Sequence, residues 1–599
     1  MSSQPKPSRS GAGEPPHGFT SWFAASALPP IAALVIVSLA AYYNSLSNGF
    51  VFDDYAVIVE NKHINDLPNS LPSFFNHSYF TIAAGEASYR PLATLSYFLI
   101  HALAGPNPFY FHLGSVLLHA LNVVLAYLFF GLLPGDRFKA LLAGLLFACH
   151  PVLTEAVDCI AFNEDLLAAF FCLLALILYL KTVENGAAGA SYILSLLFFF
   201  CGLLSKEMAI TLPPIIVLYD LTFTGDKGPA LSLKSVLGTI WSRWRFYAGY
   251  AGIGLFYLVL RFVVFINPAE RGKPDFGSLF ERLLYLPSHI FSFIRLTLAP
   301  LDLNAAYVFS YPQGFFEFSN LVGWVITLGL AVGSFFLFRR FKALFFGIWW
   351  FLITLIPVYN LIPIFNPLAE RYLYIPIIGF CLAAASVLHG ICRKALNRPA
   401  GANLASLTVV LAIVSVYATA TIARNRDWKD GLTLWSKTVK QSPASGIAHG
   451  SLGRAYQEQG LLDQAIAEYR QAIKIMPNHF KAYYNLAVVY DQQGDFAKAV
   501  ESLKRSIAIN PGYANAHYNL AIIYHKQGLM ADAIGHYKKV INLMPDDFEA
   551  RNNLGVALAM QGQLDQAILE WERVLKIDPA NKSAQDNLSK ARAVLKNAN

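Results

Sequence analysis

Two adjacent aspartates, Asp53 and Asp54, follow the first long apolar run of the sequence, in the stretch "NGFVFDDYAVIVEN". Adjacent carboxylates can bind a divalent cation, or one can remove a proton from a hydroxyl while the other orients the substrate. The same pair can also be a helix N-cap followed by a solvated loop residue. Because Phe50, Phe52 and Tyr55 surround the pair, we expect a partly buried position and a catalytic role.

Four further polar clusters lie at the ends of apolar runs. They read "HPVLTE", "NED", "SKE" and "AERY", and their candidate site residues are His150, Glu155, Glu164, Lys206, Glu207, Glu370 and Arg371. Ionisable groups at membrane depth are costly and usually face a functional interior. Each cluster alone could be an ordinary solvated helix end, but five clusters on one side of a membrane would indicate one shared cavity.

The elements that must position these clusters are membrane helices. Of the 599 residues 55% are hydrophobic and only 14% are charged, which is typical of a multi-pass membrane protein. A bilayer core of ~30 Å needs roughly 20 apolar residues per helix. The sequence predicts about eleven spans, at 22–46, 109–133, 138–157, 163–181, 190–204, 207–223, 246–266, 319–338, 342–360, 371–390 and 404–423.

The orientation follows from the basic loops, since short loops rich in lysine and arginine stay in the cytoplasm. If the spans alternate, every basic loop lies on one side of the membrane, provided that the apolar stretch 281–300 does not make a single crossing. We therefore expect a re-entrant, in-plane or hairpin element there. The tail 1–21 is then cytoplasmic, and all five polar clusters lie on the other side. The segment 61–106 is expected to form short external helices at the interface. The basic loops are Lys6 and Arg9, Arg137 and Lys139, Lys181, 227–245, "RRFK" at 339–342 and "CRKALNR" at 392–398.

Several other functions find no support in the sequence. The six cysteines lie in or beside the predicted spans without a CxxC spacing, so neither a disulfide framework nor a zinc site is indicated. We expect no cofactor; a divalent metal is possible but not indicated. The net charge of +8 matches the basic loops, and no basic, aromatic-rich patch suggests nucleic acid.

The composition changes after residue 423, and a repeat of 34 residues appears in the part of the chain that follows. Glycine recurs at 460, 494, 528 and 562, alanine at 465, 499, 533 and 567, and proline at 477, 511, 545 and 579. This is the period and pattern of tetratricopeptide repeats, each made of two antiparallel helices. We therefore predict a linker at 424–445, four repeats at 446–579 and a capping helix at 580–599, in an all-α fold whose repeats bind a partner or acceptor protein.

The motifs together resemble a known family. The runs "NGFVFDDYAVIVEN", "YRPLATLSYFLIHALAGPNPFYFHLGSVLLHALNVVL", "FACHPVLTEAVDCIAFNEDLLA", "LLSKEMAITLPPIIVLYD" and "ERYLYIPIIGF", followed by the repeats, are similar to the transmembrane and tetratricopeptide repeat-containing O-mannosyltransferases. These proteins belong to the GT-C superfamily, whose donors are sugars linked to polyprenyl phosphate. The resemblance covers the chain from about residue 25 to its end, and makes 22–423 the transferase domain.

The resemblance implies roles for individual residues. Asp53 would take the proton from an acceptor hydroxyl and Asp54 would help to orient it. Arg371 would stabilise the departing phosphate, because a guanidinium offers a planar fork of donors. Arg90, in "YRPL", and Lys206 would assist at the donor phosphate, and the remaining polar residues of the clusters would line the cavity. The stretch "FNEDLLA", with Glu164, departs from the arginine-containing segment of animal members, so the resemblance does not fix the sugar as mannose.

Three alternatives remain open at this point. A GT-C transferase could glycosylate a lipid or a glycan, although such an acceptor needs no peptide-binding repeats. A non-catalytic membrane scaffold could use the repeats alone, and would not require the acidic pair. A transporter would show two related halves with broken helices, which the sequence lacks. We expect an integral protein of a bacterial inner membrane with its repeats in the periplasm, or of the endoplasmic reticulum with lumenal repeats if the source is eukaryotic.

Overall fold

A computed structural model of the chain describes two units. The first ends at Asp430, and the second consists of the chain from Gly431 onwards together with the short segment Ala306–Val308. The described residues are 28–598, without 62, 66, 72, 73, 75–88, 135–136, 187–188, 225–232, 265–277, 309–314, 339, 363, 365, 397 and 546. The predicted cytoplasmic tail and the first residues of the first predicted span lie outside them. All regular elements in the described part of the chain are helices, which confirms the all-α prediction.

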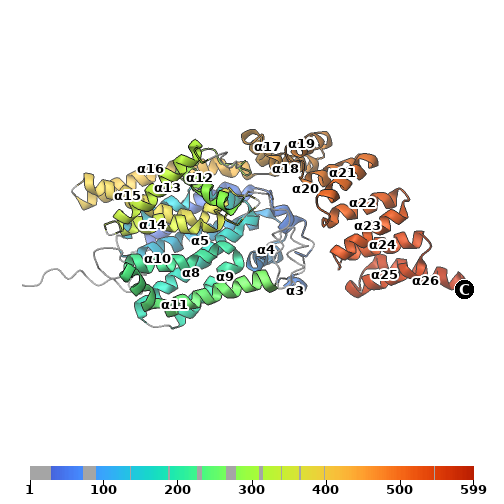
Figure 1. Cartoon of the computed structure of the whole chain (residues 1–599), viewed down its shortest axis with the longest axis horizontal. Helices are drawn as coiled ribbons and strands as arrows, with labels where there is room; N and C mark the ends of the chain where they lie inside the picture. Colours follow the sequence, from blue (N-terminus) through green and yellow to red (C-terminus); the bar gives the residue numbers. More distant parts are fainter. Residues whose placement is uncertain are drawn as a thin grey trace, which may run out of the picture. The chain divides into compact units, whose positions relative to one another are not determined.

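The first unit is a bundle of apolar helices. α5 (Pro108–Leu132) packs on α6 (Arg137–Ala148) and α8 (Asn163–Asn185), α8 packs on α9 (Ala190–Ser205), and α14 (Lys342–Thr354) packs on α15 (Tyr374–Ala395). Figure 1 shows these helices in blue to yellow. The spans that contain α5 and α8 are each 61% buried, whereas those of α11 (Leu233–Val259) and α16 (Pro399–Asn425) are 22% buried. The bundle core therefore lies around α5 and α8, and α11 and α16 are peripheral.

Seven helical segments of the described residues are long and apolar enough to cross a membrane, which confirms a multi-pass protein but not the number of eleven spans. An eighth crossing is possible if α6 and the segment Pro151–Asp158, bent by 54° from it, form one broken span. The proline after His150 explains the break, since proline removes a backbone donor. Four shorter apolar helices complete the set, at Pro91–Ala104, Ala190–Ser205, Phe318–Ser334 and Lys342–Val358.

Two segments with special predictions are helical in part. Within 61–106 the structure describes α3 (Leu67–Ser70) and α4 (Pro91–Ala104), and the rest of that segment falls largely on residues that are not described. The stretch 281–300 lies in one helix, α12 (Leu279–Leu298), which begins with a capping box between Ser278 and Glu281 and contains Pro287. It is not among the seven candidate spans, so its path relative to the membrane stays a prediction.

The other elements of the first unit are short or link these helices. They are α2 (Leu28–Tyr42), η2 (Tyr43–Ser47), η3 (Tyr55–Val59), η6 (Pro151–Leu153), α7 (Thr154–Asp158), η7 (Ile160–Phe162), η8 (Glu207–Thr211), α10 (Leu212–Tyr219), η9 (Asp220–Thr224), η10 (Leu260–Val264), α13 (Phe318–Leu337), η11 (Ile356–Val358), η12 (Glu370–Leu373) and η13 (Arg426–Trp428).

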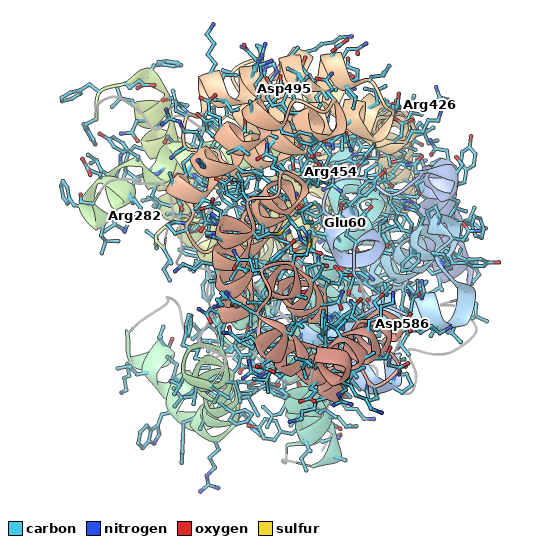
Figure 2. The ribbon with its side chains drawn as sticks, turned by 90° about the vertical axis from the view of Figure 1, so that its right-hand side faces the viewer. Glu60, Arg282, Arg426, Arg454, Asp495 and Asp586 are labelled. Atoms are coloured by element: carbon cyan, nitrogen blue, oxygen red, sulfur yellow. The ribbon has the colours of Figure 1, made fainter. Side chains whose placement is uncertain are left out.

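The second unit is an array of helix pairs. Its helices are α17 (Gly431–Gln441), α18 (Gly446–Glu458), α19 (Leu462–Ile475), α20 (Phe480–Gln492), α21 (Phe496–Ile509), α22 (Ala514–Lys526), α23 (Met530–Leu543), α24 (Phe548–Met560), α25 (Leu564–Ile577) and α26 (Lys582–Ala598). Each helix from α18 to α25 packs on its partner, and α19, α21 and α23 each pack on the first helix of the next pair. Figure 2 labels Arg454, Asp495 and Asp586 along the array. The four predicted repeats are therefore present as helix pairs, and α26 packs on the last of them.

The 34-residue pattern has two physical causes. The recurring glycine ends the first helix of each repeat with a left-handed residue, at φ between 73° and 78°, a conformation that favours glycine. The second cause is a close helix crossing. A Cβ atom added to Gly555 would lie 2.6 Å from Trp571 Nε1, and one added to Gly453 would lie 2.8 Å from the Tyr469 ring. A small residue on the first helix therefore makes room for a large one on the second.

Candidate functional site

The two adjacent aspartates differ in their surroundings. Asp54 is fully buried, and its carboxylate accepts hydrogen bonds from the backbone N–H groups of Ala161 (2.7 Å) and Val51 (3.0 Å). Burial raises the pKa of Asp54 to about 7, although these hydrogen bonds act in the opposite direction. Asp53 is only half-buried. Asp54 thus ties its own turn to the segment before α8, and Asp53 is the more accessible carboxylate.

The backbone before Asp53 is strained. Phe52 has φ of 54°, which is the left-handed region and is an outlier for a bulky side chain. Its ring packs edge-on against Phe162, with centroids 5.6 Å apart, and this contact holds the turn. The same Phe162 ring carries the guanidinium of Arg371, whose Cζ lies 4.1 Å from the ring centroid. Phe162 therefore places the Asp53 turn and Arg371 in the same neighbourhood.

Arg371 is held by a carboxylate on one edge of its guanidinium. Its Nη1 pairs with Glu155 Oε1 at 2.5 Å and its backbone N–H donates to Glu155 Oε2 at 2.9 Å. Glu155 is fully buried, so it fixes both the backbone and the side chain of Arg371. Among the residues that the structure describes, Nε and Nη2 have no hydrogen-bond acceptor, and the charges of Asp53 and Asp165 act on this guanidinium.

A second set of charges, here called the acid–base network, lies next to Arg371. Arg90 contacts Glu207 through two bonds, Nη2 to Oε1 at 3.0 Å and Nε to Oε2 at 3.3 Å, and its Nη1 pairs with Glu164. The Tyr372 ring lies 5.0 Å from Arg371 Cζ and 5.7 Å from Lys206 Nζ, so the network and Arg371 are neighbours. The network consists of Arg90, Glu164, Asp165, Lys206, Glu207 and Arg261.

Lys206 occupies the space between two carboxylates of the network. Its Nζ lies 3.0 Å from Glu164 Oε1 and 2.5 Å from Asp165 Oδ2, and its side chain is 3% exposed. Buried charges need partners, and here the Lys206 ammonium is the partner of both carboxylates. No group of three or more histidine, cysteine, aspartate or glutamate side chains in the described part of the chain has a geometry suited to a metal ion.

Two of the predicted site residues, His150 and Glu370, make contacts with the backbone or with other side chains beside the site. His150 is fully buried; its Nδ1 accepts from the backbone of Val152 at 3.3 Å and its Nε2 lies 3.1 Å from the carbonyl of Thr297. Glu370 is also fully buried and pairs with Arg424 at 3.3 Å. Both residues stabilise the ends of helices around the site.

The structure brings together residues from all five predicted polar clusters or the segments beside them, which were inferred from topology alone. Sequence reasoning missed Arg261 and Arg424. Arg261 lies near the end of a predicted apolar span, where an ionisable residue is itself a signal of function. Arg424 directly follows the last predicted span. The specific roles given to the site residues stay predictions.

Comparison with known families places this site in context. The profile described as "Dolichyl-phosphate-mannose-protein mannosyltransferase" matches residues 90–239, a range that includes five of the six residues of the acid–base network. Two profiles of tetratricopeptide repeats match the second unit, one at 453–494 and 490–528 and the other at 512–580. Among solved structures, the MamA protein matches 24% of this chain and 79% of its own with 28% identity, but the TM-score of 0.23 supports no argument.

Relatives match about three quarters of the chain. Protein O-mannosyl-transferase TMTC1 of Homo sapiens is 28% identical over 75% of this chain and 55% of its own length. TMTC3 of Mus musculus is 26% identical over 76% and 52%, and TMTC2 of Homo sapiens is 26% identical over 74% and 62%. The chain thus spans about half to three fifths of the length of these relatives. By these matches and by its own motifs, the chain is a homologue of the transmembrane and tetratricopeptide repeat-containing O-mannosyltransferases.

Proposed function

We propose that this protein is a GT-C glycosyltransferase that moves a sugar from a polyprenyl-phosphate donor to serine or threonine hydroxyls of proteins on the non-cytoplasmic side of a membrane. The observation that carries the proposal is that Phe52, next to Asp53, and Arg371 both contact the Phe162 ring, and that the charge of Asp53 acts on the Arg371 guanidinium, which has no protein acceptor at Nε and Nη2 among the described residues. Such a transfer needs one base for the acceptor and one cation for the leaving phosphate, and the site offers both.

The proposed reaction is a single displacement with inversion. Asp53 removes the proton of the acceptor hydroxyl while the oxygen of that hydroxyl bonds to the anomeric carbon of the sugar. The bond from that carbon to the phosphate oxygen breaks, and its electron pair stays on the departing polyprenyl phosphate. Arg371 donates from Nε and Nη2 to the phosphate oxygens as their charge grows, an interaction that strengthens in the transition state.

Arg90 and Lys206 serve the donor in a different way. Both are already paired with carboxylates, so they set the electrostatic potential near the phosphate rather than supplying open donors. Arg371 is therefore the principal phosphate ligand in this proposal. The mannose donor named for the matched family is a candidate, and the sugar itself has to be determined.

The second unit would hold the acceptor. Arrays of helix pairs present an extended surface along which a peptide can lie, so the repeats would recruit the segment that carries the acceptor hydroxyl. We propose that the repeats face the periplasm of a bacterium, or the lumen of the endoplasmic reticulum if the protein is eukaryotic. This side is the one to which the basic-loop rule assigns the polar clusters.

The test is transfer of radiolabelled sugar from a panel of polyprenyl-phosphate donors to membrane and secreted proteins. Wild type is compared with Asp53→Asn and with Glu60→Gln, a change of the same kind at an exposed acid seven residues away (Figure 2). We expect labelled protein with wild type and Glu60→Gln, and a loss of at least about 100-fold with Asp53→Asn, as for other removed acid–base groups.

Other outcomes would point to the alternatives. If the label appears only on lipid or glycan, the acceptor is a lipid or a glycan and not a protein. A complete absence of transfer from every donor, with the repeats still retaining a specific partner protein, would favour a non-catalytic scaffold. Equal transfer by wild type and Asp53→Asn would keep the enzyme but remove Asp53 as its base.

A further inference from the structure

Arg261 is an arginine turned inward on a helix whose neighbouring residues face outward. It lies in η10, directly after α11, and is 8% exposed, whereas Phe262, Val263 and Val264 are 57%, 68% and 55% exposed. An arginine in an apolar segment normally faces a polar interior. Here the guanidinium meets the hydroxyl of Tyr257 at 2.8 Å and Glu207 Oε2 at 3.2 Å.

Glu207 is shared between two arginines. Arg90 bonds to both of its carboxylate oxygens, and Arg261 bonds to the oxygen that Arg90 Nε also contacts. The Glu207 side chain is 36% exposed, so it can rotate when one of these contacts is lost. Because Glu207 fixes one edge of Arg90, Arg261 acts on the orientation of Arg90 through this carboxylate.

Arg261 also sets the charge of the acid–base network. Among the residues that the structure describes, three cations (Arg90, Lys206, Arg261) then face three carboxylates (Glu164, Asp165, Glu207), so the net charge of these six side chains is zero. Without Arg261, two cations face three carboxylates and the net charge is −1. An anionic phosphate that approaches such a site meets an additional repulsion, which is strong where water is excluded.

We propose that Arg261 is a positioning residue for donor binding: it neutralises and holds Glu207, so that the donor phosphate meets an acid–base network without excess negative charge. The inference rests on the proposed function for the location of the donor. It assigns to Arg261 an effect on donor affinity rather than on the bond-breaking step, since Arg261 touches neither Asp53 nor Arg371 in any contact of the described residues.

Arg243 provides a matched control on the same helix. It also pairs with a buried carboxylate, Asp220, at 2.9 Å, and Asp220 also accepts from the hydroxyl of Tyr247 at 2.7 Å. Eighteen residues separate it from Arg261, about 27 Å along the helix. Loss of Arg243 should therefore disturb helix packing to a similar degree without altering the charge near the donor.

The test measures donor KM and kcat for full-length protein in nanodiscs, and separately the affinity for undecaprenyl phosphate without a sugar. We expect Arg261→Ala to raise the donor KM and the Kd for this phosphate about tenfold, with kcat lowered less than threefold. Arg261→Lys, which keeps the charge, and the double variant Arg261→Ala/Glu207→Gln, which restores neutrality, should each recover most of the lost affinity. Arg243→Ala should leave both constants unchanged.

Defined results would overturn the inference. If Arg261→Ala binds undecaprenyl phosphate as well as wild type does, or if Glu207→Gln fails to rescue a folded Arg261→Ala variant, the residue has no role in donor binding. If Arg243→Ala weakens binding as much as Arg261→Ala does, the effect is one of helix stability. The phosphate affinity is measured in an assay that involves no transfer. If the proposed transferase activity is wrong, the wild-type protein would bind undecaprenyl phosphate but transfer no sugar, and the inference on Arg261 would still stand.

Discussion

A histidine pair in the third repeat predicts that this repeat loses stability as the pH falls. His517 Nε2 lies 3.2 Å from the carbonyl oxygen of Pro511, and because a carbonyl only accepts, this nitrogen carries the proton. His517 Nδ1 lies 2.9 Å from Nδ1 of His536, so His536 donates there. A second proton on His517 would sit on Nδ1 and point at the N–H group of His536. The intact pair can therefore take up only one additional proton, on the other nitrogen of His536.

The first and fourth repeats place a glutamate opposite the corresponding residue. His449 meets Glu468 at 2.6 Å in the first repeat, and Arg551 meets Glu570 at 3.1 Å in the fourth. The third repeat has no such acid opposite His517. The charged and titratable groups that act on the pair are Asp532, Lys504 and Lys539, and the Tyr524 ring lies 5.8 Å from that of His536.

Burial lowers the pKa of both His517 and His536, and nearby lysines lower it further. For a histidine with a lowered pKa, stability is complete above the unfolded value of about 6.5 and is lost as the pH falls below it. One proton bound by the unfolded chain but not by the folded pair costs about 1.4 kcal/mol per pH unit. From pH 7 to pH 5 this gives at most about 2 kcal/mol, and half-exposure of His536 reduces it.

The assay is hydrogen–deuterium exchange of full-length protein in nanodiscs between pH 5 and pH 7.5, with intrinsic exchange rates corrected for pH. Peptides from α22 and α23 report the pair, and peptides from α24 and α25, which contain Arg551 and Glu570, serve as an internal control. The variant His536→Glu supplies the missing acid, which raises the pKa of His517, so its stability should be retained or gained as the pH falls.

Two results would refute this reasoning. One is an equal loss of protection at low pH in the third and fourth repeats, which would indicate a general acid effect. The other is a pH response of His536→Glu that matches wild type, which would show that another group in the repeat binds the proton.

Four further predictions concern single changes. Asp54→Asn should lower the free energy of unfolding by about 1–3 kcal/mol, because an amide nitrogen would face backbone N–H groups; thermal unfolding with Asp53→Asn as the control tests this. Arg371→Lys keeps the charge but loses the fork of donors, so kcat in the transfer assay should fall at least about tenfold. Gly555→Ala should lower the free energy of unfolding of the repeats by about 1–3 kcal/mol, since its Cβ would lie 2.6 Å from Trp571. A urea titration that follows the unfolding of the repeats can measure this loss. Chelation with EDTA should leave transfer unchanged within a factor of about two, because Lys206 already neutralises the carboxylates that a metal ion would need.

The repeats could be predicted from the sequence because each recurring residue answers a local packing demand. Glycine at 460 and its equivalents supplies a left-handed turn, and alanine at 465 and its equivalents fills a fully buried contact. These demands recur every 34 residues, so the period itself carries the fold. The number of membrane crossings is less local, since α4, α9 and α14 are too short to be judged by length and hydropathy.

The proximity of the polar clusters could be predicted from the sequence, but their contacts could not. Alternation of spans placed the polar clusters on one side, and the structure brings them together. Whether Asp53 or Asp54 points inward depends on the left-handed Phe52 and on the backbone of Ala161, more than 100 residues away. Adjacent loop residues give no periodicity from which such directions can be inferred. The role of Arg261 could not be predicted either, because in the sequence it is a single charged residue near the end of an apolar span.

The charges around Phe162 also explain why one aspartate and one arginine suffice for the proposed reaction. As the sugar leaves, the phosphate gains one negative charge, and the proton taken from the hydroxyl removes one from Asp53. The net charge of the site therefore stays constant, and the reaction only shifts charge from the aspartate to the phosphate. Arg371 interacts with Asp53 and keeps two donors without protein acceptors among the described residues, so it can follow this shift without moving its buried partner Glu155. A fixed cation between the two positions stabilises the transition state at little cost in reorganisation, which is the electrostatic reason to expect Arg371→Lys to lower kcat more than it raises the donor KM.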